Sequence, residues 1–136
     1  MDVIVLIARI LFVAIFLASG IGHLKATEAM AGYAQYKKVP APKLSVIVSG
    51  VLMVVGALSV LLGAWGDLGS LLLLVAILPI PFLMHRYWAE EGEARATEQV
   101  QFNKTVSLVG GALALFALFV MVPELSLTVT DPLFTL

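Results

Sequence analysis

The side chains best suited to chemistry in this chain are its two histidines, His23 and His85. Each follows a long apolar run, so we expect each at the point where a helix leaves a membrane. An imidazole there can ligate haem iron or another metal, or form a hydrogen bond with a quinone oxygen. Two isolated histidines can equally cap helix ends, where cations and donors are favoured. The spacing does not indicate a metal site, and the other interpretations stay open.

Arg9 is the one charged residue inside the first apolar run, 3–22. A charge at that depth costs roughly 2.5–3.5 kcal/mol, while each Leu, Ile, Val or Phe returns about 0.3–0.6 kcal/mol, so the run can insert. At about 100° per residue, Arg9 shares one helix face with Phe16, Gly20 and His23. We expect this face to point into the protein.

A third group of candidate residues follows a break in the third apolar run. Pro79 and Pro81 lack a backbone N–H and should kink or end the helix. The segment from His85 to Trp88 comes directly after them, and its aromatic rings could hold a flat ligand or a lipid headgroup. An aromatic belt with a basic anchor explains the same residues without any ligand.

The composition excludes several classes of activity. The chain has no Cys, which excludes dithiol chemistry, thiolate metal sites and cysteine nucleophiles. The sequence contains neither a Gly-rich phosphate loop nor a serine-hydrolase elbow. No complete catalytic constellation is recognisable, so the sequence does not indicate an enzyme. The formal net charge of -1 argues against a nucleic-acid partner.

Hydropathy sets the expected fold class. The 136 residues are 61% hydrophobic and 12% charged, as in polytopic membrane proteins. About twenty helical residues, at ~1.5 Å each, cross the ~30 Å apolar layer of a bilayer. We expect a single all-α domain over 1–136, a bundle of four transmembrane helices at about 3–22, 44–64, 68–88 and 105–122. The polar connections are then 23–43, with a short interfacial helix that begins near Thr27, and 85–104, and a tail covers 123–136.

The distribution of basic residues predicts the orientation. Lys and Arg outside the spans lie only in the two long connections, at Lys25, Lys37, Lys38, Lys43, Arg86, Arg95 and Lys104. Cytoplasmic loops carry this excess, so both connections should be cytoplasmic and both termini extracytoplasmic. Arg9 then lies toward the outer leaflet. We expect it to pair with Asp67 or Glu124, and the alternative is a guanidinium that reaches the interface alone.

Small residues predict where helices pack against each other. They let two backbones approach closely in a lipid environment, where no hydrophobic force favours helix over lipid. We expect interfaces inside the bundle, with a dimer face as the alternative, at Ser49, Gly56 and Gly63 on the second span and at Gly110 and Ala114 on the fourth.

Several segments, taken in order, resemble the DoxX family of small four-span bacterial membrane proteins. They are residues 7–11, 18–24, 39–40, 50–63, 84–90 and 103–111. By this resemblance Arg9 matches the family's first-span arginine, and His85 and Trp88 match its histidine and following aromatic residue. Lys104 matches the start of the fourth span.

The chain also departs from the family pattern at three places. Met53 stands where many members carry Glu, and the turn 65–67 lacks their basic residue. His23 stands where Lys is common. If the family's Glu and turn residue form a polar site, this chain has lost it or rebuilt it as Arg9 with Asp67.

The resemblance implies a role in redox-linked membrane complexes, because a related family supplies the membrane subunit of a thiosulfate:quinone oxidoreductase. Our leading hypothesis is a non-catalytic subunit or scaffold of a redox or envelope complex, held in the lipid of the bacterial inner membrane beside other subunits. One alternative is a quinone- or haem-binding subunit of an oxidoreductase, and another is a small-solute or lipid transporter. The candidate ligand-binding residues are Arg9, His23, His85, Trp88 and Lys104.

Overall fold

The computed structural model describes residues 2–134. Its helices are α1 Asp2–Lys25, α2 Thr27–Tyr36, α3 Pro42–Leu62, α4 Gly66–Ile77, α5 Ile80–Leu83 and α6 Gly92–Met121, with a 3₁₀ turn, η1, at Tyr87–Ala89. Four helical segments are long and apolar enough to cross a membrane, namely α1, α3, the segment Gly66–Ala89 and α6. The expected all-α membrane bundle is therefore confirmed. Residues 135–136 of the expected tail lie outside the described residues.

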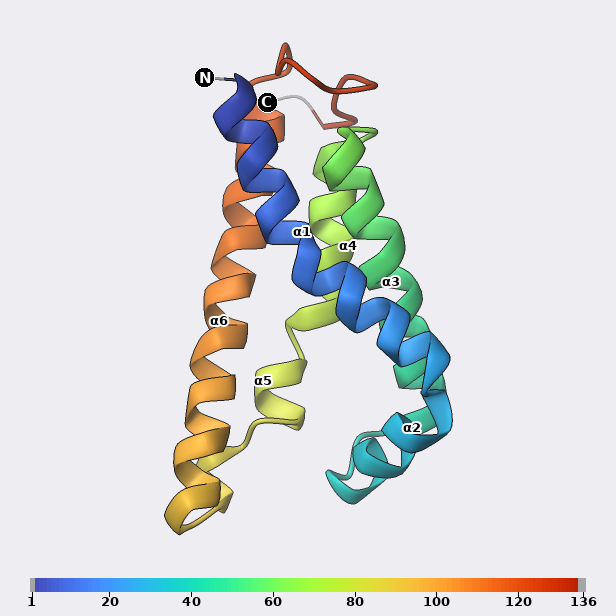
Figure 1. Ribbon diagram of the computed structural model, residues 1–136, viewed down its shortest axis with the longest axis vertical. Helices are drawn as coiled ribbons and strands as arrows, with labels where there is room; N and C mark the ends of the chain where they lie inside the picture. Colours follow the sequence, from blue (N-terminus) through green and yellow to red (C-terminus); the bar gives the residue numbers. More distant parts are fainter. Residues whose placement is uncertain (1, 135–136) are drawn as a thin grey trace.

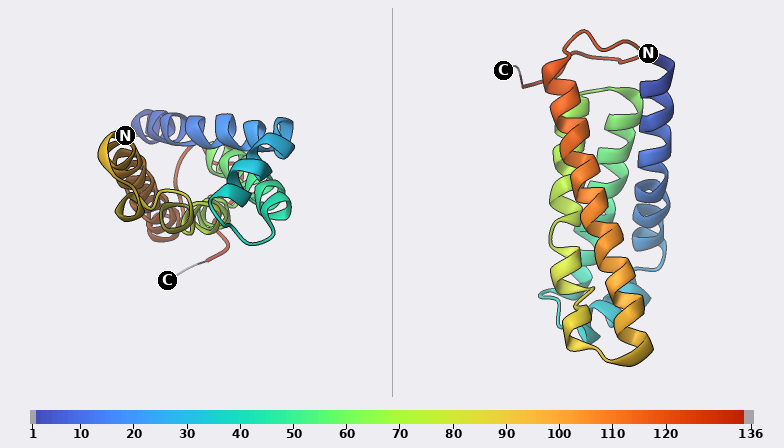
Figure 2. Two further views of the ribbon diagram at one scale, coloured as in Figure 1. Left: turned by 90° about the horizontal axis from the view of Figure 1, so that it is seen from below. Right: turned by 90° about the vertical axis from the view of Figure 1, so that its left-hand side faces the viewer.

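The bundle has two distinct ends (Figure 1). The N-terminus and the tail after α6 lie at one end, which we call the terminal end. The helix α2 and the segment 84–91 lie at the other, which we call the connection end. Seen from below in Figure 2, α2 crosses the end of α3. Figures 1 and 2 also show α1 and α6 diverging from the terminal end toward the connection end.

The short helix in the first connection exists and begins at Thr27, as expected. The N-cap is Ala26, and Thr27 is the first residue of α2. The Thr27 hydroxyl donates 2.8 Å back to the carbonyl oxygen of His23 in α1. Because this bond uses one of the free carbonyls at the end of α1, the chain passes from one helix to the next with almost no loop.

The third span is interrupted. The fourth span is part of a longer helix, α6, which begins in the polar connection before it. The helix α4 ends at Ile77, Pro79 precedes the short α5, and η1 follows. The helix α6 already begins at Gly92, where we expected connection until residue 104. Residues 92–104 are polar but rich in Ala, Glu, Gln and Arg, which favour helix. Hydropathy marks only the apolar part of such a helix, so the predicted span at 105–122 is the apolar part of α6.

Glycines bring α3 into direct contact with α1 and α4. A Cβ added at Gly56 would lie 2.9 Å from the carbonyl oxygen of Gly69 in α4. One added at Gly20 of α1 would lie 2.9 Å from the carbonyl oxygen of Gly50. Gly63 has a different role from the expected one. It ends α3 with φ +64°, a left-handed conformation that favours glycine.

The expected packing stripe on α6 faces outward, so that prediction was wrong. Gly110 and Ala114 are exposed, and a Cβ added at Gly110 would meet nothing within 4 Å. The neighbouring positions pack inward instead: Gly111 contacts Phe12 of α1, and Ala112 is fully buried. A shift of one residue turns a helix by about 100°, so small residues at consecutive positions do not reveal which of them faces the core.

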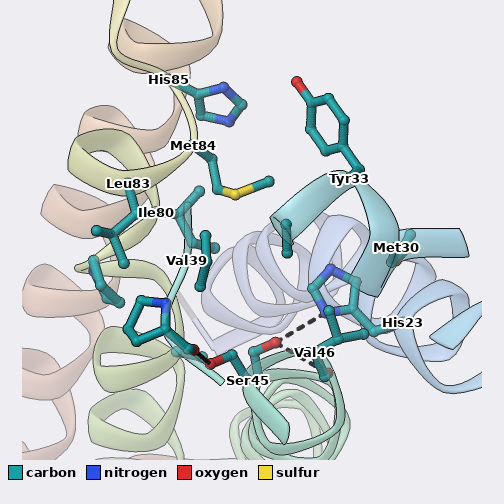
Figure 3. A pocket seen from close by; sticks show the side chains of 15 residues that line it. His23, Met30, Tyr33, Val39, Ser45, Val46, Ile80, Leu83, Met84 and His85 are labelled. Atoms are coloured by element: carbon teal, nitrogen blue, oxygen red, sulfur yellow. Dashed lines mark hydrogen bonds between the residues drawn. The ribbon is translucent and has the colours of Figure 1, made fainter. Parts of the chain in front are cut away.

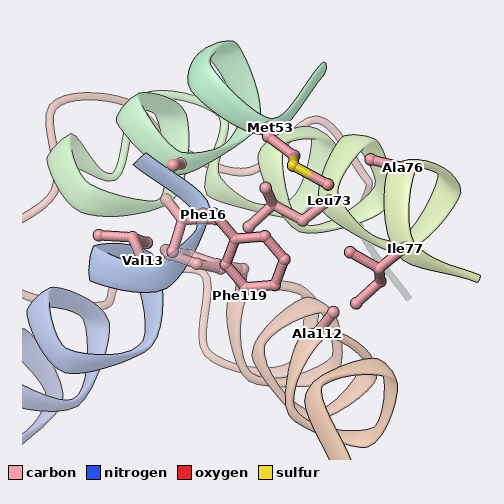
Figure 4. Packing of buried hydrophobic residues seen from close by; sticks show 10 residues of the cluster. Val13, Phe16, Met53, Leu73, Ala76, Ile77, Ala112 and Phe119 are labelled. Carbon is pink, nitrogen blue, oxygen red and sulfur yellow. The ribbon is translucent and has the colours of Figure 1, made fainter. Parts of the chain in front are cut away.

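A buried apolar core joins the four spanning segments (Figure 4). Val13 and Phe16 come from α1, as the periodicity of the first span predicts, and Met53 comes from α3. Further core residues of α4 and α6 are Leu73, Ala76, Ile77, Ala112 and Phe119. This core separates the polar groups of the two ends.

Candidate functional site

At the terminal end, Arg9 is fully buried and bonded to backbone. Its Nε donates 2.9 Å to the carbonyl oxygen of Val60, and its Nη2 donates to those of Leu61 and Leu127, the latter at 3.0 Å. Val60 and Leu61 lie in the last turn of α3, where helical carbonyls have no intrahelical partner and the helix dipole attracts a cation. Arg9 of α1 therefore caps the end of α3.

The expected ion pair of Arg9 with Asp67 or Glu124 is wrong. Glu124 is exposed. Asp67 is fully buried, but its Oδ2 accepts a hydrogen bond of 2.7 Å from the backbone N–H of Phe134 in the tail. Between residues 2 and 134, Arg9 Nη1 and Asp67 Oδ1 are the buried side-chain polar atoms left without a partner. Free carbonyls at a helix end satisfy the guanidinium without the desolvation of a second charge.

At the connection end, a cavity of about 320 Å³ lies between α2, α3 and the break from α4 to α5. Figure 3 shows the rings of His23 and His85 among the side chains that line it. Most of the remaining wall is apolar, for example Val46, Ile80 and Met84. The cavity is large enough for an organic ring, and its few polar groups are the two imidazoles, Tyr33 and serine hydroxyls.

A second lobe of about 150 Å³ adjoins this cavity on the side of α1 and α6. The two lobes share His23, Ile80 and His85 as lining residues. The second is also lined by Ser19 of α1 and by Lys104 of α6. Three of the candidate residues, His23, His85 and Lys104, therefore line this pair of neighbouring cavities, and the second cavity has residues of both α1 and α6 in its wall.

His23 is held in place by α3. Its Nδ1 lies 2.9 Å from the hydroxyl of Ser49. Ser49 in turn donates its proton 3.1 Å to the carbonyl oxygen of Val46, so its oxygen is free to accept from the Nδ1–H of His23. Gly50 permits this approach, because a Cβ there would lie 2.9 Å from the Cβ of His23. The ring is fixed through Nδ1, and the lone pair of its Nε2 remains available.

His85 is held by a carboxylate that we did not predict. Its Nδ1 lies 2.8 Å from Oε2 of Glu98 in α6. The other oxygen, Oε1, accepts a hydrogen bond of 2.8 Å from Nζ of Lys37, which follows α2 and is only 9% exposed. Lys37 Nζ also lies 3.4 Å from Oε1 of Glu90. This cluster of four side chains ties α2, α6 and the segment 84–91 together.

The surroundings of Lys37 favour its charged form. Burial alone lowers the pKa of an ammonium, but the hydrogen bond to Glu98 and the nearby acidic groups outweigh it. The pKa of Lys37 is therefore raised above its ordinary value. Its Nζ also lies 5.7 Å from the centre of the Tyr33 ring, a second favourable contact for a cation.

Comparison with known proteins identifies the family. The family model named DoxX matches residues 4–86, more than half of the chain. The chain belongs to the DoxX family. The inner membrane protein YphA of Escherichia coli K12 is 30% identical over 113 residues, which cover 83% of this chain and 81% of YphA. No solved structure matches the chain. Together with the four apolar segments, these matches confirm a multi-pass protein of the inner membrane.

Trp88 does not line the cavity of this DoxX protein. It is 52% exposed, and its ring packs edge-on against Tyr87 at 5.3 Å and Phe102 at 5.9 Å between centroids. Tyr87 makes a similar contact with Phe102 of α6. The aromatic cluster holds the segment 84–91 against α6, and thereby places His85 beside Glu98.

Lys37 and Glu98 are the site residues that sequence reasoning missed in this DoxX chain. Lys37 had the appearance of one more basic interfacial residue, and Glu98 stood among several acidic residues of a polar connection. Their importance depends on α2 crossing the end of the bundle and on α6 extending beyond the apolar run. Nothing in their local pattern indicates either arrangement.

The two imidazoles share a chemical capability. Between residues 2 and 134, their hydrogen bonds use Nδ1, and no side chain or backbone group bonds either Nε2. A neutral ring that donates from Nδ1 carries a lone pair at Nε2. The cavity therefore offers two acceptors for hydroxyl protons, and each ring becomes a donor to a carbonyl oxygen when protonated.

Proposed function

We propose that this DoxX protein is a non-catalytic membrane subunit that holds a quinone or hydroquinone between His23 and His85 for a redox complex of the inner membrane. The observation that carries the proposal is the pair of neighbouring cavities, whose mostly apolar walls carry the two fixed imidazoles, a few hydroxyl groups, Gln101 and Lys104. An apolar wall with a few placed polar groups suits a flat ring with oxygens at opposite edges. In this proposal the partner subunits perform the redox step.

The divergence of α1 and α6 supports entry of such a ligand from the lipid. Ser19 and Lys104 lie on the two helices beside the second lobe, and a hydrophobic tail could remain in the gap between them. We also propose the orientation given by the basic residues, with the connection end toward the cytoplasm. The ring would then lie at the depth of the inner leaflet.

Binding of a short-chain ubiquinol and of the matching ubiquinone to the detergent-purified protein tests the proposal. We expect saturable binding of the reduced form, and His23→Phe and His85→Phe should each weaken it about tenfold, the value of one hydrogen bond. Met121→Leu is the control, because Met121 is 76% exposed at the terminal end of α6 and lines neither cavity, and it should bind as the wild type does.

Two results would contradict this function. If the wild-type protein binds neither the quinol nor the quinone at saturating concentration, the proposed ligand is wrong. A Soret band in the absorbance spectrum, lost together in His23→Phe and His85→Phe, would assign the two imidazoles to haem instead.

A further inference from the structure

His85 connects the cavity with a second, open groove. The groove has a volume of about 450 Å³ and is lined by Tyr33, Tyr36, Lys37, Glu90, Glu93 and Glu98 among others. The cavity on the other side of His85 is mostly apolar. Glu98 and Lys37 lie between the two spaces and are largely buried, and both also line the groove.

The hydrogen-bonded groups between the two spaces form one continuous chain. Nε2 of His85 is free on the side of the cavity, and Nδ1 lies 2.8 Å from Oε2 of Glu98. Oε1 of Glu98 is 2.8 Å from Nζ of Lys37, and this Nζ is 3.4 Å from Oε1 of Glu90. The side chain of Glu90 is 35% exposed and lines the groove. No gap longer than a hydrogen bond or a close ion pair interrupts the chain.

We infer that His85 and Glu98 exchange protons between a hydroxyl-bearing ligand in the cavity and the water of the groove. The inference rests on the proposed function for the identity of that ligand. The ligand O–H gives its proton to Nε2 of His85, and the Nδ1–H of the same ring passes to Oε2 of Glu98. The carboxylic acid so formed loses its proton to the water of the groove, which Glu98 itself lines. The ligand ends as the anion, one proton reaches the groove, and no electrons move.

Lys37 acts in this chain as a positioning residue. Its ammonium holds Oε1 of Glu98, so that Oε2 faces His85. The guanidinium of Arg86 donates 3.1 Å to the backbone carbonyl of Lys37 and fixes that residue in turn. Charged and titratable groups surround Glu98 on three elements. Tyr33 lies in α2 and Lys37 directly follows it, the segment 84–91 contributes His85, Arg86 and Glu90, and α6 contributes Glu93.

The competing explanation is a purely structural cluster that ties α2 to α6. Such a cluster would fail on mutation by loosening the fold, and it would not control the access of protons to the cavity. A measurement of proton access in a folded, ligand-occupied protein separates the two explanations.

The probe is a 2-hydroxy-1,4-naphthoquinone with an alkyl tail, whose colour changes when its hydroxyl ionises. With the bound probe, a rapid pH jump reports how fast the cavity hydroxyl responds to bulk water. Glu98→Gln keeps the shape of the side chain but cannot take up a proton. We expect it to slow the response at least about tenfold while the Kd of the probe stays the same.

Glu93→Gln is the matched control, because Glu93 lines the groove outside the chain of hydrogen bonds, and its response should equal that of the wild type. Equal rates in Glu98→Gln and wild type, both with probe bound, would overturn the proton path and leave the proposed function standing. A wild type that binds no probe would overturn both. If Glu98→Gln does not fold, Glu98→Asp takes its place, since it keeps the charge opposite Lys37 but shortens the side chain that reaches His85. An unchanged rate there would equally overturn the path.

Discussion

Arg9 shows how a single charged residue in an apolar helix can serve structure. Its guanidinium cannot lose its proton at ordinary pH, so it must find acceptors when buried. It finds them in the carbonyls of Val60, Leu61 and Leu127, and the Phe119 ring lies 5.9 Å from its Cζ. The periodicity of the first span predicted that Arg9 faces inward. It could not predict the acceptors, because free carbonyls at a helix end depend on where another helix stops.

Arg9→Leu should lower the stability of the folded protein by about 2–4 kcal/mol, because three carbonyl groups, one buried and two partly buried, lose a charged donor. Unfolding in detergent, followed by circular dichroism, measures the loss. Arg9→Lys keeps the charge but lacks the planar guanidinium with its several N–H donors. It should therefore recover only part of the lost stability. A neutral or stabilising Arg9→Leu would show that the charge carries a net cost where it lies.

The raised pKa of Lys37 predicts how the cluster responds to alkali. A raised folded pKa means that the ammonium form stabilises the fold below the ordinary lysine value, and that this contribution is lost as the pH rises through the folded pKa. The difference in Tm between wild type and Lys37→Met should therefore be constant between about pH 7 and pH 10 and should shrink above that range. A difference that disappears already near neutrality would mean that Lys37 is not held by Glu98.

At the scale of helices, two glycines in similar sequence contexts occupy opposite environments. A Cβ at Gly56 would press on the backbone oxygen of Gly69, while one at Gly110 would meet nothing within 4 Å. Gly56→Ala should therefore destabilise the bundle, because a backbone atom of α4 would have to move. Gly110→Ala should stabilise it by about 0.5–1 kcal/mol through the smaller entropy of the unfolded chain.

Thermal unfolding of the two alanine variants beside wild type checks this prediction. Equal Tm values for Gly56→Ala and wild type would mean that α3 and α4 can separate at no cost. A destabilised Gly110→Ala would show that the outward face of α6 is itself covered, in which case a second copy of the chain is the first occupant to test.

Hydropathy predicted the number and order of the spans because each apolar run has the length of a bilayer. The position of Pro79 also predicted the break in the third span. The polar ends of the helices could not be predicted from hydropathy. Residues 92–104 form helix, but they contain no long run of apolar residues that hydropathy could detect. For the same reason, the sequence predicted the histidines of the candidate site but not their partners in polar segments. His23 and His85 stand at the ends of apolar runs, whereas Lys37 and Glu98 stand in polar segments whose positions only the folded chain determines.

At the scale of the whole molecule, the orientation of the bundle sets the side on which the cavity opens. The seven basic residues of the connections predict that the connection end is cytoplasmic. Because the chain has no Cys, single cysteines can report the orientation directly. Ser126→Cys in the tail should react with an impermeant maleimide in intact cells, and Ala96→Cys near the start of α6 should react only after lysis. The reverse pattern would place the histidines and the groove on the outer side.

The tail is bonded to the two deepest charges of the terminal end, and this has a consequence for the order of assembly. Leu127, whose carbonyl accepts from Arg9, lies 118 residues further along the chain, and Phe134 donates to Asp67 from 67 residues away. The helix α1 thus completes its hydrogen bonds only after the tail has been made. Until then, Arg9 has only the end of α3 for an acceptor, and Asp67 has no donor from the tail. Removal of the tail would keep the four spans and lose the contacts that join α1 and α4 to residues 127–134.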